Sequence, residues 1–94
     1  MIIQVLQGHI DRGVPKDSCL CPIALAIKDK IGEEELNCYV SVGIGLIAIY
    51  KPQTGKYFKG YPTTGKIRRF LRNFDAQIIP VKPFEFELLE ENTL

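Results

Sequence analysis

Along this chain the spacing of apolar positions changes from one segment to the next, and each spacing predicts an element. Residues 2–6 form a β-branched apolar run, typical of a strand near the centre of a sheet. Between Pro22 and Gly32, isoleucines recur at every fourth position, which predicts a buried helix that begins at the proline and stops at the glycine. Residues 36–42 then alternate between apolar and polar side chains, the pattern of a half-buried strand.

The second half of the chain continues with three more predicted strands. Two of them, at residues 46–50 and 56–61, are joined by a hairpin turn at Pro52-Gln-Thr-Gly55, in which proline presets the turn and glycine tolerates positive φ. The last strand is predicted at residues 84–88, where apolar side chains alternate with glutamates. Pro83 suits the start of that strand or a sheet edge.

A second helix is predicted before this last strand. Its apolar stripe falls at positions i, i+3, i+4 and i+7 and consists of Ile67, Phe70, Leu71 and Phe74. Thr63 or Thr64 is expected to cap its N-terminus, and Asp75 lies near its end.

The resulting order, β-α-β-β-β-α-β, predicts an α+β fold. Three consecutive strands joined by short turns favour an antiparallel meander. We expect an antiparallel or mixed sheet of four to five strands, with two helices packed on one of its faces. Residues 1–94 are expected to form a single domain whose last few residues, 90–94, fray.

Composition places the chain among globular proteins. Of its 94 residues, 46% are hydrophobic and 24% are charged, far from the signature of disorder. No apolar run approaches the roughly 20 residues that a membrane-spanning helix needs. The odd count of three cysteines and the absence of a leader argue against a disulfide framework. We therefore expect a cytoplasmic protein with no membrane partner.

A formal net charge of +1 hides an uneven distribution of charge. No acidic residue occurs between residues 37 and 74, whereas residues 85–94 contain four glutamates and no base. The candidate binding surface joins the bases of the middle segment to neighbouring tyrosines. Its members are Lys51, Lys56, Tyr57, Lys59, Tyr61, Lys66, Arg68, Arg69 and Arg72.

Two interpretations of this surface follow from the residues. Arginines three and four positions apart on a helix repel one another, which is reasonable if an anion lies between them, and tyrosines can stack on bases. The simpler interpretation is a solvated helix face, with cations favourably placed toward the helix C-terminus. Lys56 or Lys59 would then pair with Glu85 or Glu87 across neighbouring strands.

A second candidate site lies in the loop before the first helix. It comprises His9, Asp11, Arg12, Cys19 and Cys21. A histidine can activate a cysteine nucleophile near a helix N-terminus, and the same groups are metal ligands. The cysteine spacing does not match zinc sites and a fourth ligand is not evident. We therefore predict no catalytic residue, metal or cofactor, and expect packing roles, with Asp11 and Arg12 in a surface loop open to a partner.

Two segments carry a family resemblance. The first consists of His9-Ile10-x-x-Gly13 followed by Cys21-Pro22-Ile23-Ala24-Leu25-Ala26. The second consists of Pro62, then Phe70-Leu71-x-x-Phe74-Asp75, then Val81-x-Pro83-Phe84-x-Phe86-x-Leu88. Together they resemble small uncharacterised proteins of bacteriophages and bacterial genomes. That family commonly has Cys-x-x-Cys-Pro, whereas Cys19 and Cys21 are one residue closer, so no metal role is carried over. The resemblance implies a setting in the bacterial cytoplasm, virus-encoded or not.

The sequence thus favours a small non-enzymatic binding protein over an enzyme. The resemblance suggests a phage or mobile-element accessory factor that inhibits or sequesters a host partner or ligand, in counter-defence or host takeover. Its partner is expected to be a protein or an anionic ligand. The alternatives are nucleic-acid or nucleotide binding through the same basic and aromatic residues, and a Cys/His-dependent enzyme or metal site. A homodimer through an edge strand near Pro83 is left open.

Overall fold

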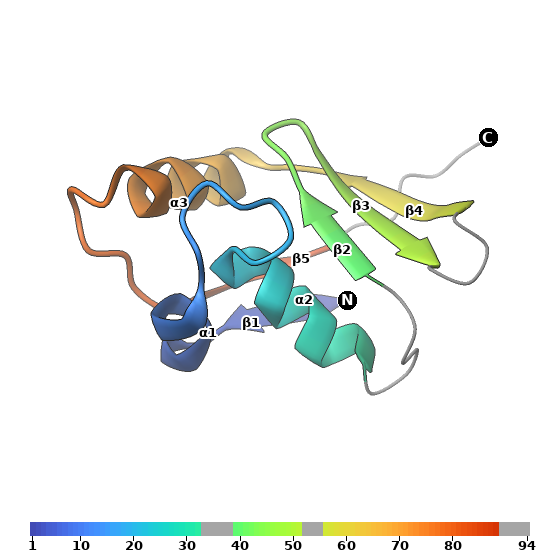
Figure 1. The fold of residues 1–94 in the computed structure, drawn as a ribbon, viewed down its shortest axis with the longest axis horizontal. Coiled ribbons are helices and arrows are strands. Elements are labelled where there is room, and N and C mark those ends of the chain that lie inside the picture. Colours follow the sequence, from blue (N-terminus) through green and yellow to red (C-terminus); the bar gives the residue numbers. More distant parts are fainter. Residues whose placement is uncertain (33–38, 52–55, 89–94) are drawn as a thin grey trace.

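The computed structural model describes residues 1–32, 39–51 and 56–88, with the backbone alone for Tyr39, Lys51 and residues 56–59. The elements follow the order β1-α1-α2-β2-β3-β4-α3-β5 (Figure 1). Their bounds are β1 Ile2–Val5, α1 Gln7–Arg12, α2 Pro22–Gly32, β2 Tyr39–Val42, β3 Leu46–Lys51, β4 Lys56–Pro62, α3 Gly65–Ala76 and β5 Phe84–Glu87. The predicted start of the second strand at residues 36–38, the turn at 52–55 and the fraying end at 90–94 lie outside the described residues.

The α+β class is confirmed, but the expected single sheet is two antiparallel sheets (Figure 1). One consists of β1 and β5, and the other has the order β2-β3-β4. β1 therefore lies at a sheet edge in the described part of the chain and not at the predicted centre. The physical reason is that alternation of side chains specifies which face of a strand is buried but not which strand lies beside it.

The pairing of β1 with β5 also corrects the proposed charge pairs. Glu85 lies opposite Gln4 and Glu87 lies opposite Ile2, whereas Lys59 of β4 lies opposite Ile49 of β3. Lys56 and Lys59 are thus not cross-strand partners of the two glutamates. Both glutamates are exposed while Phe86 between them is buried, which confirms the predicted alternation of this strand.

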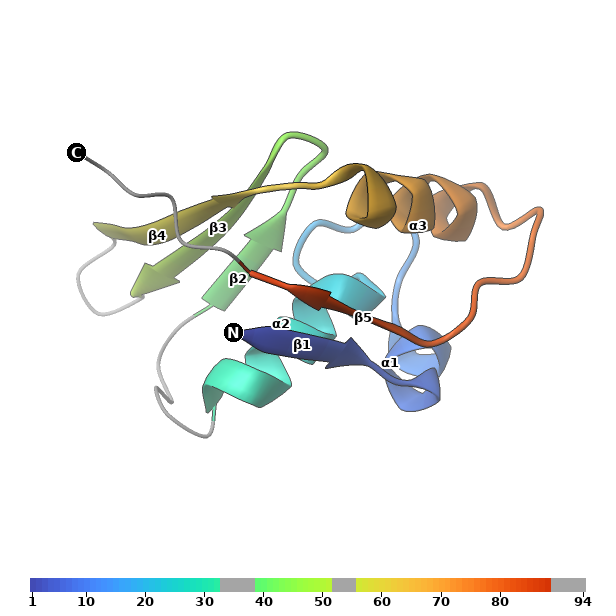
Figure 2. The same cartoon turned by 180° about the vertical axis from the view of Figure 1, so that it is seen from behind.

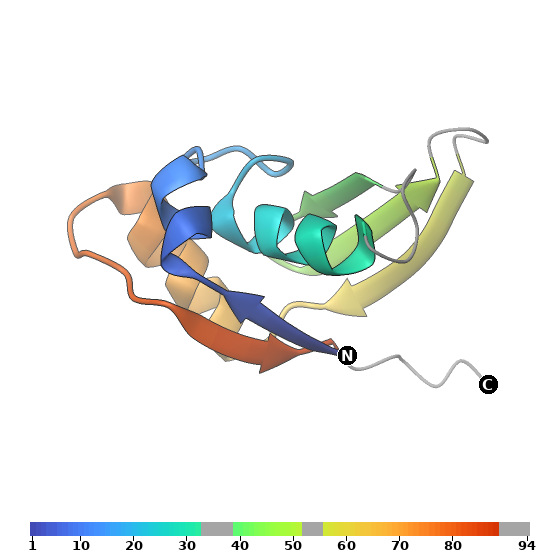
Figure 3. The same ribbon diagram turned by 90° about the horizontal axis from the view of Figure 1, so that it is seen from below.

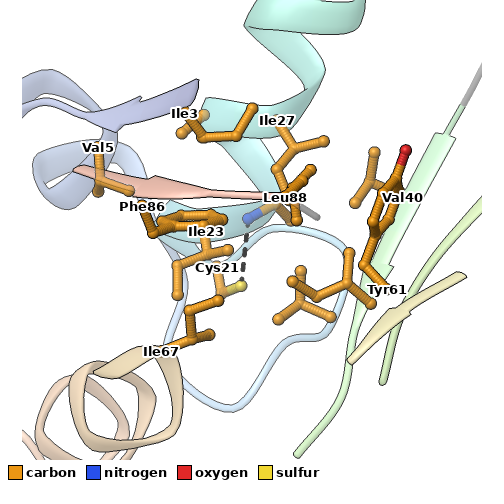
Figure 4. Close-up of a cluster of buried hydrophobic side chains, with 14 of the residues drawn as sticks. Ile3, Val5, Cys21, Ile23, Ile27, Val40, Tyr61, Ile67, Phe86 and Leu88 are labelled. Atoms are coloured by element: carbon orange, nitrogen blue, oxygen red, sulfur yellow. Dashed lines mark hydrogen bonds between the residues drawn. The ribbon is translucent and has the colours of Figure 1, made fainter. Parts of the chain in front are cut away.

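α2 holds the two sheets together. It contacts β1 on one side and β2 on the other (Figure 3). Its side chains Ile23 and Ile27 are fully buried, and Figure 4 shows Ile27 among core residues from both sheets, including Ile3 of β1 and Val40 of β2. Burying such an isoleucine stabilises the fold by roughly 1.5–3 kcal/mol. The helix begins at Pro22 and ends at Gly32, as predicted from the sequence.

α3 packs beside β5 (Figure 2). The predicted stripe of Ile67, Phe70, Leu71 and Phe74 is buried, and the ring centroids of Phe70 and Phe84 lie 4.7 Å apart. Thr64 caps the helix, because its side chain accepts a hydrogen bond from the Ile67 N–H at 3.5 Å. The stripe leaves the opposite side of α3 to solvent.

The short helix α1 was not predicted. It occupies residues where a loop was expected, so Asp11 and Arg12 lie on a helix. Both are engaged within it: Gln7 Nε2 donates to Asp11 Oδ1 at 2.9 Å, and Arg12 Nε donates to the Gly8 carbonyl at 3.2 Å. The loop interpretation of these two residues is therefore wrong.

Candidate functional site

The solvent side of α3 carries three arginines, Arg68, Arg69 and Arg72, which we call the arginine surface. All three side chains are exposed. They project from the side opposite the buried stripe, because positions 68, 69 and 72 lie about half a turn from positions 67, 70, 71 and 74 on a helix of 3.6 residues per turn. Within the described residues, no hydrogen bond or ion pair joins any of the three guanidinium groups to another group.

The position of these arginines along α3 argues against the simplest interpretation. A helix places cations favourably in its last turn, but the last turn of α3 contains no basic residue. The first turn contains no acidic residue, and Arg68 lies at its end, where the helix dipole opposes positive charge. The dipole therefore does not account for the arginines, and an external anion would relieve their mutual repulsion.

Lys66 does not belong to the arginine surface. Its ammonium donates to the backbone carbonyl of Glu85 at 2.7 Å and lies 5.4 Å from the centroid of the Phe84 ring. These contacts attach the start of α3 to β5. Lys66 is therefore best explained as a structural residue, although the sequence grouped it with the arginines.

Tyr61 is also removed from the predicted surface. Its side chain is 2% exposed and packs in the hydrophobic core (Figure 4). Its strand position explains why, since Tyr61 lies directly opposite the buried Ile47 and shares its face of the sheet. The side chains of the remaining predicted members, Lys51, Lys56, Tyr57 and Lys59, lie outside the described residues.

The second candidate site is not assembled as the sequence suggested. His9 is buried, and neither of its ring nitrogens is bonded to Cys19 or Cys21. Instead, the Leu6 N–H donates to His9 Nδ1 at 2.9 Å, and His9 Nε2 lies 2.6 Å from Asp29 Oδ2. Because Nδ1 accepts a hydrogen bond, the ring proton of the neutral histidine lies on Nε2 and is donated to Asp29. Both nitrogens are occupied, so His9 has no lone pair with which to activate a thiol.

This histidine has a structural function that the sequence did not reveal. Leu6 is the N-cap of α1, and His9 is the third residue of that helix, so its ring satisfies a backbone N–H as the acidic residue of a capping box does. Arg12 approaches the same carboxylate, with 3.7 Å between its terminal nitrogen and Asp29 Oδ2. Asp29 thus joins α1 to α2. The sequence around Asp29 gives no sign of this role, because Asp29 lies 20 residues from His9.

The two described cysteines have different surroundings. Cys19 is half-buried, and its N–H donates at 2.9 Å to Asp17 Oδ1, which also accepts from the Leu20 N–H. Cys21 is 2% exposed, and its sulfur accepts the Ala24 N–H at 3.4 Å. Burial raises the pKa of the Cys21 thiol, which opposes formation of a nucleophilic thiolate. Within the described residues, no cluster of His, Cys, Asp and Glu side chains has the geometry to hold a metal.

The raised pKa of Cys21 predicts a loss of stability in alkali. The folded protein keeps the thiol proton at pH values where the unfolded chain has lost it. Its contribution to stability is therefore complete below the ordinary pKa of 9.0 and falls as the pH rises above that value. Urea unfolding gives the free energy of unfolding of the parent and of Cys21→Ala. The difference between the two should narrow above pH 9.0, because only the parent loses the contribution of the thiol. Parallel plots of unfolding free energy against pH for the two proteins would contradict this. The control Cys19→Ala keeps Cys21, so its plot should have the same pH dependence as that of the parent.

Several hollows indent the described surface. A groove of about 450 Å³ lies between β1 and α2 and is lined by Ile2, Gln4, Leu6, His9, Ala26, Asp29 and Lys30. Another, of about 350 Å³, lies beside the segment after α3, where Ile78 and Ile79 are exposed. A smaller one of about 150 Å³ contains Asp75, which accepts the Lys16 N–H at 2.8 Å. None of them includes a residue of the arginine surface.

No helix in the described part of the chain is long and apolar enough to cross a membrane. Comparisons with protein-family models, with curated proteins and with solved structures find no match to this chain.

Proposed function

We propose that this protein is a non-enzymatic binding protein whose arginine surface docks on an acidic patch of a partner protein. The observation that supports this most directly is the exposure of Arg68, Arg69 and Arg72 on one side of a rigid helix with no described partner. Arginine is well suited to the task because its planar group binds carboxylates through two hydrogen bonds. The buried stripe of α3 anchors the helix, so the three arginines extend from fixed positions on one element before the partner arrives.

The engaged state of the other candidate groups supports a binding role over catalysis. His9 uses both ring nitrogens in structural hydrogen bonds, and Cys21 is buried with a raised thiol pKa. Binding would then be stoichiometric, as in an inhibitor or a sequestering protein. The resemblance to small phage and bacterial proteins supports an accessory role of that kind in the bacterial cytoplasm.

A partner protein suits this surface better than a single-stranded nucleic acid does. Single strands are held by exposed aromatic rings together with basic side chains. Tyr61 is in the core, and none of the exposed large hydrophobic side chains in the described residues is aromatic. The surface thus offers charge and bidentate hydrogen bonds without a described stacking platform.

The arginine surface should bind acidic probes. A fluorescent polyglutamate peptide should bind at low salt, and the combined change Arg68→Gln, Arg69→Gln, Arg72→Gln should weaken binding about 10- to 100-fold. This range follows from roughly 0.5–1 kcal/mol for each exposed charge contact. Fluorescence anisotropy measures both affinities.

The matched control removes the same charge elsewhere. Lys16→Gln, Lys30→Gln, Lys82→Gln also lowers the net charge by three, at exposed lysines outside the arginine surface. It should retain most of the affinity. Equal losses in the two variants would show that net charge alone attracts the probe. Tighter binding of an oligonucleotide than of polyglutamate, with a steep salt dependence, would favour the nucleic-acid alternative over a protein partner.

A further inference from the structure

The outer edge of β1 is an unpaired strand edge in the described structure. Met1 and Leu88 exchange backbone hydrogen bonds, at 2.8 Å from the Leu88 N–H to the Met1 carbonyl and 3.3 Å from the N-terminus to the Leu88 carbonyl. Hydrogen-bonded pairs alternate along an antiparallel ladder, so the backbone N–H and C=O groups of Ile3 and Val5 also point toward β5. The N–H and C=O groups of Ile2 and Gln4 therefore point away from β5.

Two side-chain contacts confirm this alternation and show where the edges are closed. On the β5 side, the outward carbonyl of Glu85 accepts the Lys66 ammonium, and α3 lies along that edge (Figure 2). On the β1 side, the outward N–H of Leu6 donates to His9 Nδ1, which closes the far end. The outer edge of β5 is therefore covered at Glu85, two residues from Pro83, and the outer edge of β1 is open at Ile2 and Gln4.

The groove of about 450 Å³ runs along this open edge, with α2 as its other wall. Its β1 wall presents exposed apolar side chains on both sides of Gln4, because Ile2 is 47% and Leu6 is 54% exposed. On the α2 wall, Ala26 has a side chain too short to fill the space, while Lys30 is exposed. Within the described residues, no group bonds to the outward backbone atoms of Ile2 or Gln4.

We propose that this groove, the β1 edge groove, binds an extended peptide segment of a partner protein by strand addition to β1. Unpaired N–H and C=O groups in strand geometry match a peptide backbone and no other common ligand. Ile2 and Gln4 offer two donors and two acceptors, enough to pair with about three residues of an incoming strand. Apolar side chains at alternate positions of the peptide would cover Ile2 and Leu6.

A peptide fits the groove better than a second copy of β1 does. The C-terminal half of α2 lies beside the β1 edge (Figures 2 and 3). In a dimer formed by β1 pairing with its own copy, the strands would lie about 4.8 Å apart. Because α2 forms the other wall of the groove, a second copy would have to bring its own α2 into the space beside this edge, where packed helices need about 8–10 Å between their axes. A bare strand carries no helix and avoids this conflict.

The test uses amide hydrogen exchange followed by NMR. The probe is a blocked peptide of alternating valine and threonine at millimolar concentration. In the free protein, the amides of Ile3 and Val5 should be protected and those of Ile2 and Gln4 should exchange rapidly. Adding the peptide should slow exchange of the Ile2 and Gln4 amides about tenfold when the groove is about nine-tenths occupied. The same peptide N-methylated at alternate residues should leave them unchanged.

Variants distinguish edge pairing from general adhesion. Gln4→Pro removes an outward N–H that β5 does not use, so binding should be lost while the ladder to β5 remains. Leu6→Ser tests the same groove without changing the backbone and should weaken binding several-fold. Ile79→Ser, at an exposed residue of another hollow, is the control. The proposal is overturned by protected Ile2 and Gln4 amides in the free protein, by no protection on peptide addition, or by equal binding of the N-methylated peptide.

Discussion

Replacing His9 by alanine should lower the free energy of unfolding by about 2–4 kcal/mol. The side chain is 6% exposed and fills two hydrogen-bonding roles at once. Its loss leaves the Leu6 N–H without an acceptor at the start of α1, releases Asp29 from its donor and opens a cavity between the two helices. Urea denaturation followed by circular dichroism measures the change.

The companion variant His9→Asn separates the two roles. An asparagine oxygen can reach the place of Nδ1 and accept the Leu6 N–H, but it is too short to reach Asp29. Its stability should therefore lie between those of the parent and His9→Ala. If asparagine and alanine destabilise equally, capping by the ring contributes little. If His9→Ala is as stable as the parent, the structural role of His9 is wrong.

Gly13→Ala should destabilise the fold by about 1–3 kcal/mol through overpacking. A Cβ at this position would lie 2.6 Å from both Cδ and Cγ of Pro22 and 2.9 Å from its backbone nitrogen. Pro22 is fully buried at the start of α2, so neither partner can move without disturbing the core. The backbone of Gly13 has a φ of −67°, so the effect is steric and not conformational. Thermal and urea unfolding measure it.

Gly8→Ala is the matched control for that substitution. Gly8 lies inside α1, and a Cβ there would meet nothing within 4 Å. Alanine is the better helix former, so this change should stabilise the protein by about 0.5–1 kcal/mol. The two glycine substitutions are therefore expected to change the free energy of unfolding in opposite directions. A neutral Gly13→Ala would show that the contact between Gly13 and Pro22 relaxes freely.

The helices α2 and α3 could be predicted from sequence because their signals are local. Each has an apolar stripe of correct period with a proline, threonine or glycine at its boundary, and each lies where the pattern placed it. The division into two sheets could not be predicted, because it depends on which strands meet. Only the fold brings β5 back to β1, which pairs residues 79 to 85 positions apart in the sequence.

The candidate site was predictable in part for the same reason. Helical spacing placed Arg68, Arg69 and Arg72 on one side of a helix, and all three are exposed on α3, because they belong to one element. The contact of Lys66 with Glu85 could not be predicted, since the two residues are distant in the sequence. The burial of Tyr61 contradicts its predicted place on the surface and depends on its pairing with Ile47. A register shift between Ile49 and Tyr50 further breaks the simple alternation of this strand pair. The bond between His9 and Asp29 joins separate helices and leaves no pattern in the sequence.

Docking of an acidic partner on the arginine surface, as we propose, can be observed residue by residue. The most direct measurement is an NMR titration of the isotope-labelled protein with polyglutamate, observing backbone amides and the arginine Nε–H signals together. The largest shifts should fall on Arg68, Arg69 and Arg72 and should decrease with added salt. Shifts confined to other parts of the protein, with the arginine signals unmoved, would contradict it.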